Sequence, residues 1–281
     1  MDTIRLSSQR WNGARGPRRI VCLTPESADI LYALGAGERV VGVSGYTVTP
    51  PEARRKPKVG AYTTVDIDRV TALEPDLVVA YSDLQADVTA ALTRRGATVL
   101  HLNQRTFDGL CHAVELLGGV VGEPDAAVEL IGRIRGECAS ASRAARSLPR
   151  RPRVYFEEWD DPLISGIGWV SEAVAIAGGD DVFADLNRSG AARERVVSAD
   201  EVRRRDPDIV FASWCGKKVR TERIAARPGW QDIAAIRDGH VYEIKSAYIL
   251  QPGPSVLTGV RQMADRIAAW STGAPGAARP S

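Results

Sequence analysis

The sequence predicts an α/β protein of two similar αβ lobes with mainly parallel sheets, joined by one long rigid helix and separated by a cleft. Apolar runs suited to strands alternate with helical segments, which is typical of βα units. A thirteen-residue pattern, Asp-x-Val-x4-Pro-Asp-(Leu/Ile)-Val-x-Ala, occurs at residues 68–80 and again, without a gap, at 200–212. Residues 125–148, between the copies, form a long run rich in Ala, Arg and Glu that favours a single helix.

Each half of the chain predicts one lobe. In chain order the first half predicts strand 20–23, a helix ending at Gly35 and Gly37, strand 40–44, the first repeat copy, helix 84–95 and strand 97–102. The second half predicts strand 153–159, a loop over 160–168, helix 170–181, the second repeat copy, a further helix, strand 240–244 and helix 255–270. Each repeat copy reads as a short helix that stops before Pro75 or Pro207, followed by a buried strand.

These elements divide the chain into five parts. We expect a loose N-terminal segment (1–18), an N-terminal lobe (19–122), the connecting helix (123–148), a C-terminal lobe (149–270) and a flexible tail (271–281). The helix is taken as a rigid connector, because an amphipathic partner-binding helix is less expected between two αβ units.

Composition narrows the class of partner. The 281 residues carry a net charge of +2 without a dominant basic stripe, so we expect no nucleic acid partner. No apolar stretch is long enough to cross a bilayer. The first residues lack the apolar segment of a secretory signal, and four separate cysteines favour a reducing compartment. As written, the chain therefore reads as a cytoplasmic protein, and we expect a monomer.

Aromatic side chains follow the predicted strands. Ligands of open α/β sheets bind beyond the carboxyl ends of the strands, and rings there suit a large, flat or partly apolar ligand. The rings that follow strands are Tyr46, Tyr81, Trp159, Trp214 and Tyr248, and Tyr62 and Trp169 stand in loops on the same side. Any single ring could equally close a lobe edge, but five at equivalent positions favour a binding cleft.

The polar residues favour binding over catalysis. Glu157 and Glu158 are neighbours on a strand and point to opposite faces, so they cannot act as a catalytic pair. One of them, Glu158 by our assignment, can reach the cleft and accept hydrogen bonds from a ligand, although solvated acids are an equal reading. The three histidines have no metal-ligand spacing, and phosphate-loop and nucleophile-elbow motifs are absent. We expect no catalytic residue, no metal and no intrinsic cofactor.

The chain also resembles a known family, the class III periplasmic binding proteins, which deliver iron-siderophores, haem and cobalamin to ABC importers. The similarity runs from Arg19 to about Trp270 and is strongest to cobalamin-binding members. It rests on RIVCLTPESADILYALGAGERVVGVSGYTVTPPE, VGAYTTVDIDRVTALEPDLVVAY, RPGWQDIAAIRDGHVYEI and QPGPSVLTGVRQMADRI. It implies a periplasmic or other extracytoplasmic location, in contrast to the missing signal and the four cysteines.

The resemblance implies roles for particular residues. Aromatics that contact the corrinoid in cobalamin-binding members correspond to Tyr46, Tyr62, Tyr81 and Tyr248. Acids that dock on permease arginines correspond to Asp68 and Asp200, where the family more often has Glu; an acid there also suits the first turn of a helix.

The resemblance therefore implies a non-enzymatic protein that holds cobalamin or another corrinoid for an ABC importer. Trp159, Trp169 and Trp214 look peculiar to this sequence, so a haem-like ring or an aromatic siderophore remains open as the ligand. One alternative is a cytoplasmic binding or sensing protein of the same fold without a permease. The other is an enzyme with a chelatase-like bilobal fold.

Overall fold

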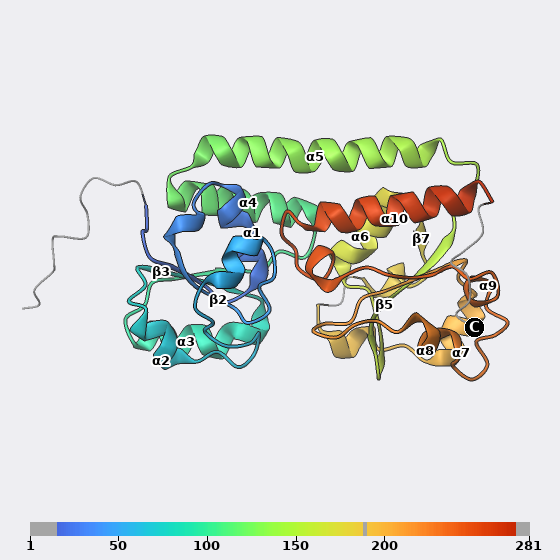
Figure 1. Ribbon diagram of the computed structural model, residues 1–281, viewed down its shortest axis with the longest axis horizontal. Coiled ribbons are helices and arrows are strands. Elements are labelled where there is room, and N and C mark those ends of the chain that lie inside the picture. The colour runs from blue at the N-terminus through green and yellow to red at the C-terminus, as the bar shows by residue number, and fades with distance from the viewer. Residues whose placement is uncertain (1–15, 188–189, 274–281) are drawn as a thin grey trace, which may run out of the picture.

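The computed structural model describes residues 16–187 and 190–273 and contains two αβ lobes bridged by one long helix (Figure 1). The N-terminal lobe lies on the left in Figure 1, the C-terminal lobe on the right, and α5 (Pro124–Arg146) passes above both. The predicted fold class is confirmed. The predicted loose N-terminal segment and flexible tail lie almost wholly outside the described residues, and helix α10 continues to Ser271.

The N-terminal lobe is built on a four-stranded parallel sheet in the order β2-β1-β3-β4. Its strands are β1 (Ile20–Cys22), β2 (Val40–Val43), β3 (Leu77–Tyr81) and β4 (Val99–Leu102). Its helices are α1 (Pro25–Ala33), α2 (Ile67–Ala72), α3 (Ala86–Arg94) and α4 (Phe107–Val121), with 3-10 turns η2 (Gly37–Arg39), η3 (Pro51–Arg55) and η4 (Asp83–Gln85). Every residue of β3 is buried, as its apolar sequence predicts.

The C-terminal lobe contains a five-stranded sheet, β6-β5-β8-β9, in which β7 pairs with the start of β5. Its strands are β5 (Arg153–Asp160), β6 (Leu163–Ser165), β7 (Asp180–Asp181), β8 (Ile209–Ala212) and β9 (Val241–Glu243). Its helices are α6 (Gly168–Ala177), α7 (Ala199–Arg205), α8 (Thr221–Ala225), α9 (Ala234–Arg237) and α10 (Val256–Ser271), with η5 (Ala184–Leu186), η6 (Ala192–Arg195) and η7 (Ser246–Tyr248).

Two expectations for this lobe are wrong. The helix expected over residues 170–181 ends at Ala177, and Asp180–Asp181 form strand β7. Residues 160–168, expected as a loop, contain β6, which pairs antiparallel with the end of β5. The pairing joins Asp160 to Leu163, so the chain turns back immediately after β5. A strand of three residues is too short to show a periodic pattern, and sequence reasoning therefore missed it.

The two repeat copies fold alike, each as a short helix followed by a buried strand. Asp66 caps α2 by accepting a hydrogen bond from the Arg69 backbone N–H at 3.0 Å. Ser198 caps α7 in the same way. The residue before each proline, Glu74 or Asp206, has a left-handed backbone, with φ of 45° and 39°. Each helix therefore ends where the proline disfavours helical backbone.

The Pro-Asp pair of each copy attaches its strand to the neighbouring one. The Asp76 carboxylate accepts hydrogen bonds from the backbone N–H groups of Arg18 and Arg19, both at 2.8 Å. The Asp208 carboxylate accepts one from the Arg153 backbone N–H, also at 2.8 Å. The aspartates thus join β3 to the start of β1 and β8 to the start of β5.

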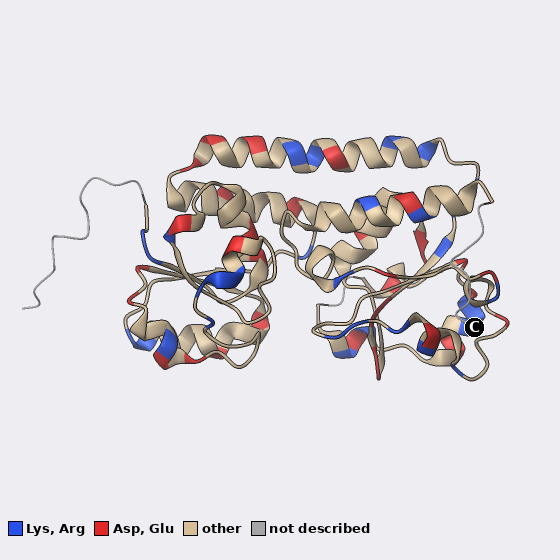
Figure 2. Ribbon diagram, viewed as in Figure 1, with Lys and Arg blue, Asp and Glu red and all other residues tan. Residues whose placement is uncertain are grey.

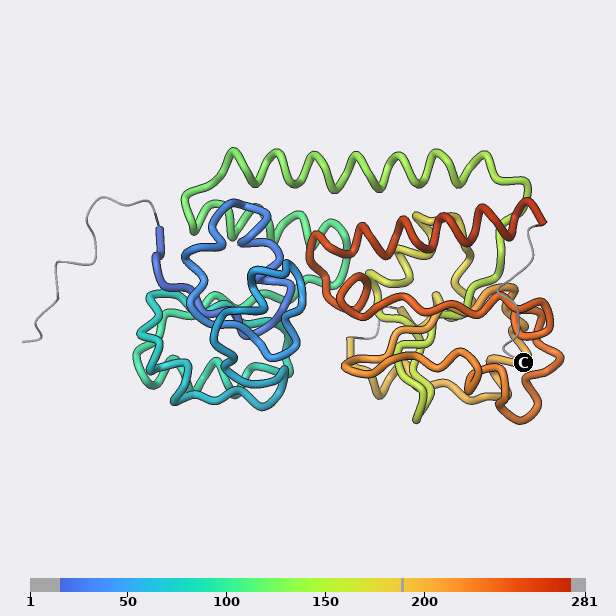
Figure 3. The backbone as a smooth tube through the Cα atoms, in the orientation of Figure 1, coloured from blue at the N-terminus to red at the C-terminus, as the bar shows by residue number. Residues whose placement is uncertain are grey.

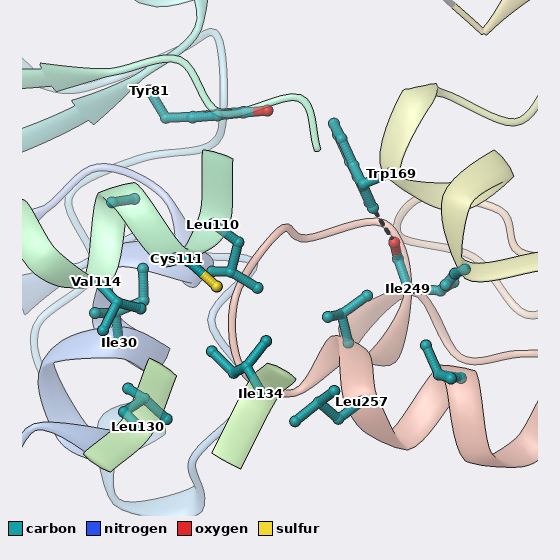
Figure 4. Packing of buried hydrophobic residues seen from close by; sticks show 14 of the residues in the cluster. Ile30, Tyr81, Leu110, Cys111, Val114, Leu130, Ile134, Trp169, Ile249 and Leu257 are labelled. Atoms are coloured by element: carbon teal, nitrogen blue, oxygen red, sulfur yellow. Dashed lines mark hydrogen bonds between the residues drawn. The ribbon is translucent and has the colours of Figure 1, made fainter. Parts of the chain in front are cut away.

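Helix α5 and a continuous apolar core hold the two lobes together. Helix α5 packs on α4 of the N-terminal lobe and on α6 and α10 of the C-terminal lobe, and Figure 3 shows α4 and α10 beneath it. The largest core cluster runs through both lobes (Figure 4). Asp29 of α1 accepts hydrogen bonds from the Ser255 backbone N–H at 2.7 Å and from its hydroxyl at 3.0 Å. Glu172 of α6 accepts one from the Phe107 backbone N–H at 2.7 Å.

Charged residues of both signs are interspersed along α5 and over both lobes (Figure 2). Across residues 16–187 and 190–273, none of the helices combines the length and apolarity that a membrane span requires. Of the four cysteines, Cys22 and Cys111 are buried, Cys138 is half-buried and Cys215 is exposed, and all are free.

Candidate ligand-binding cleft

A cavity of about 400 Å³ lies between the lobes, within the size range of small-molecule sites. Segments that follow β1, β2, β3 and β4 line one side, and segments that follow β5, β8 and β9 contribute to the other. The cavity thus lies beyond the carboxyl ends of the strands, where open α/β sheets bind their ligands, which we call the strand-end rule. The lining residues include five that the sequence predicted, Tyr46, Tyr62, Tyr81, Trp169 and Glu158.

Two tyrosines form the N-terminal wall of this interlobe cleft. The rings of Tyr62 and Tyr81 meet edge to face, with centroids 6.4 Å apart. The Tyr62 hydroxyl hydrogen-bonds with the Ser82 hydroxyl at 2.8 Å, and the Tyr81 hydroxyl donates to the Gln104 carbonyl at 2.8 Å. Burial raises the pKa of both phenols, so both remain neutral at physiological pH. The wall therefore presents uncharged aromatic surface.

Gln85 fixes the end of β3 behind these rings. Its side-chain carbonyl accepts a hydrogen bond from the Tyr81 backbone N–H at 3.0 Å, and its amide donates to the Tyr62 carbonyl at 2.7 Å. Ser82 has a left-handed backbone with φ of 63°, and its carbonyl is 2.8 Å from Nε2 of His101. The strand end is thus held by side-chain bonds that its short sequence motif does not reveal.

Trp169 provides the opposing aromatic surface in the C-terminal lobe. Its indole N–H donates to the Ile249 carbonyl at 2.7 Å, and its side chain is almost wholly buried. Figure 4 shows Trp169 and Tyr81 on the two sides of the space between the lobes. Tyr46 is 40% exposed, and a methyl group at Gly216 of the other lobe would lie 3.2 Å from its ring. Tyr46 therefore reaches across between the lobes.

Glu158 lines the cleft, but its carboxylate is bound within the protein. Arg195 is buried and donates to both carboxylate oxygens, at 2.7 and 3.1 Å, and the Ile167 backbone N–H donates at 3.1 Å. Glu157 points to the other face of β5, as alternation along a strand requires, and is paired with Arg227 in the lobe core. The Glu158 side chain is thus fixed as part of the cleft wall, whereas Glu157 lies inside the C-terminal lobe.

A second ion pair lies in the N-terminal wall. Arg105 donates to Asp83 at 2.9 Å, and its guanidinium lies 5.6 Å from the centroid of the Tyr81 ring. Cys215 also lines the cleft. Sequence reasoning did not single out these three residues, although Arg105 and Cys215 follow strands and could have been found by the strand-end rule.

Three of the predicted aromatics are not among the residues that line the cleft. Trp214 packs in the core of the C-terminal lobe, where its indole N–H donates to Glu157 at 3.1 Å. Trp159 bonds to the Asp161 carbonyl, and Lys217 lies 4.1 Å from its ring centroid. Tyr248 packs against the main core from η7. The sequence places each ring near a strand end, but it does not say toward which side the ring turns.

Glu26 is a lining residue that the sequence prediction missed. It lies in the first turn of α1, is 2% exposed, and its Oε1 has no hydrogen-bond partner in the described part of the chain. Burial is the main reason that its pKa is raised from 4.5 to about 7. Its position, four residues after the end of β1, follows the strand-end rule, but an acid at a helix start reads in sequence as a simple first-turn residue.

The predicted docking acids, Asp68 and Asp200, lie at corresponding places on the two lobes. Both stand in the first turn of their helices, and their side chains are 84% and 81% exposed. Asp68 pairs with Arg95, and Asp200 pairs with Arg203 at 3.0 Å. Figure 1 shows α2 and α7 on the side of the molecule opposite α5.

Within residues 16–187 and 190–273, no group of three or more His, Cys, Asp or Glu side chains is arranged to hold a metal ion. The fold and the cleft together define a bilobal binding protein, in which two similar αβ lobes enclose a partly apolar cavity. The chain belongs to the periplasmic binding protein family, whose model matches residues 20–248.

Individual relatives agree with this assignment. An uncharacterized ABC transporter substrate-binding lipoprotein of Bacillus subtilis is 26% identical over 270 residues, which cover 93% of this chain and 83% of the relative. A vitamin B12-binding protein of Vibrio parahaemolyticus is 27% identical over 251 residues, which cover 88% of each chain. A periplasmic heme-binding protein of Roseiflexus has the same fold, with a TM-score of 0.80 and 23% identity over 91% of this chain and all of that one. The chain is therefore a substrate-binding protein of the ABC-importer type.

Proposed function

We propose that the protein binds a corrinoid, cobalamin or a close analogue, between its lobes and presents it to an ABC importer without chemical change. The observation that carries this proposal is the cleft itself. Tyr62 and Tyr81 on one side and Trp169 on the other offer flat apolar surface to a macrocycle, and Tyr46 lies where it can cover an edge. The vitamin B12-binding relative supports the choice of ligand.

Native purification gives the first test. Protein expressed in a corrinoid-producing host and purified without denaturant is analysed by visible absorbance and by mass spectrometry. We expect a corrinoid spectrum and a matching mass at close to one equivalent. Co-purification of haem in its place would reject the corrinoid assignment, and a siderophore mass would do the same.

The same proposal gives Asp68 and Asp200 a docking role. Charge reversal of both, Asp68→Lys with Asp200→Lys, is expected to abolish ligand uptake in a reconstituted transporter while ligand affinity stays within about twofold of wild type, because both side chains lie far out in solvent. A double variant of two other exposed acids, Glu38→Lys with Glu115→Lys, serves as the control for added charge. Unchanged uptake by the Asp68/Asp200 variant would reject the docking role of these two acids.

A further inference from the structure

The charges that line the cleft are balanced, except for one. Asp83 is paired with Arg105, and Glu158 is paired with Arg195. The Arg193 side chain is 84% exposed, and within the described part of the chain it forms an ion pair only with Glu194, at 3.7 Å. Glu26 remains: it is almost wholly buried in the cleft wall, and no described Lys or Arg forms an ion pair with it.

An unpaired buried carboxyl is energetically costly, so its environment needs explanation. The Thr24 hydroxyl and the Glu26 backbone lower the pKa of this carboxyl, but burial outweighs both, and Oε1 has no hydrogen-bond partner among the described residues. The segment after Pro252 packs directly on Glu26, since a methyl group at Gly253 would lie 3.2 Å from its Cβ. The cavity is thus the remaining direction from which a partner for this carboxyl can come.

The other titratable groups around Glu26 are either neutral or hydrogen-bonded to other residues. On β1, burial raises the pKa of Cys22 to about 12, and in the same N-terminal wall burial also raises the pKa of Tyr62 and Tyr81, so all three are uncharged at neutral pH. On α1 itself, Asp29 is the nearby acid, and it is bonded to Ser255. Glu26 therefore titrates in an environment without a compensating cation.

We propose that Glu26 is a specificity-determining residue, whose carboxylate accepts a hydrogen bond from a peripheral amide N–H of the ligand and disfavours ligands that bring a carboxylate to the same place. This inference rests on the proposed function. Corrinoids carry peripheral amides and haem carries carboxylates, so Glu26 would select between the two macrocycle classes.

The physical basis is a difference between like charge and hydrogen bonding at one position. An amide N–H that meets a carboxylate forms a charge-assisted hydrogen bond. A ligand carboxylate meets like charge in a poorly hydrated wall, which forces either ligand or protein to take up a proton. The discrimination is present when Glu26 is ionised and disappears when it is protonated, so it grows as the pH rises through about 7.

The test compares two cyano-corrinoids, one with peripheral amides and its hydrolysed counterpart with peripheral carboxylates. Calorimetric affinities for both are measured at pH 5.5 and pH 8.5 with wild type, Glu26→Gln and the exposed-acid control Glu38→Gln. We expect the amide-to-carboxylate affinity ratio of wild type and of the control to rise about tenfold over this range, and that of Glu26→Gln to stay constant.

The outcomes separate the two proposals. An affinity ratio with the same pH dependence in wild type and Glu26→Gln would overturn the role of Glu26 and leave corrinoid binding intact. Failure of wild type to bind either corrinoid would overturn the proposed function and this inference with it. A folded Glu26→Gln variant is verified by its circular dichroism spectrum, and Glu26→Ala, which also removes the charge, must give the same constant ratio.

Discussion

The replacement Glu26→Gln should stabilise the protein at alkaline pH and have little such effect at acidic pH. Glu26 is buried and lacks a partner for Oε1, and its pKa is raised from 4.5 to about 7. Below pH 4.5 this residue is protonated in both the folded and the unfolded state. Above that pH the unfolded state ionises first and binds fewer protons, so the stability falls as the pH rises toward 7.

The size of the effect follows from the same pKa. One pKa unit corresponds to about 1.4 kcal/mol, so the ligand-free protein loses about 3 kcal/mol between pH 4.5 and pH 8 through this single group. Gln has nearly the same shape and cannot ionise. Any penalty from its unpaired amide does not depend on pH, so the pH dependence isolates the charge.

Urea unfolding at intervals between pH 4.5 and pH 8.5 measures this difference. We expect the free energy of unfolding of Glu26→Gln, relative to wild type, to rise by about 3 kcal/mol across the range. Glu38→Gln, an exposed acid of the same lobe, should show no such trend. A difference between Glu26→Gln and wild type that stays constant with pH would refute the conclusion that the wall holds an uncompensated acid.

Two further predictions separate the cleft from the scaffold. Trp169→Ala should weaken corrinoid binding at least tenfold, because it removes the aromatic surface of the C-terminal wall. Trp214→Phe should instead lower the free energy of unfolding by about 1–3 kcal/mol and leave ligand affinity within about twofold. Calorimetry measures the affinities and urea unfolding the stabilities, and equal affinity losses in the two variants would contradict the assigned positions. Asp76→Ala and Asp208→Ala should each lower the free energy of unfolding by about 1–3 kcal/mol, since each removes hydrogen bonds that join two strands. Neither variant should change ligand affinity. A loss of affinity without a loss of stability would contradict the scaffold role of these aspartates.

The repeat made the architecture predictable from sequence because each copy carries its own start, stop and strand. Val70 and Val202 give the helices a buried residue, Pro75 and Pro207 end them, and the apolar runs that follow become central strands. The strand-end rule then located the cleft. Strand β6 was not predictable in this way, because three residues are too few to show a periodic pattern and the turn after β5 is what brings them into the sheet.

The site was predictable at the level of segments more than of side chains. Tyr62, Tyr81 and Trp169 line the cleft, while Trp214 follows an equivalent strand and turns into the lobe core toward Glu157. Which way a ring turns depends on partners distant in sequence. Glu26 was missed for the same reason, because only the folded wall shows that its carboxyl is buried and unpaired.

Direct calorimetric titration of the purified, ligand-free protein with cyanocobalamin and, separately, with hemin tests the central claim. The account predicts one cobalamin per chain, a dissociation constant of about 1 µM or below, and much weaker binding of hemin at pH 8.5. No heat with cobalamin at tens of micromolar, or a tighter complex with hemin, would contradict it.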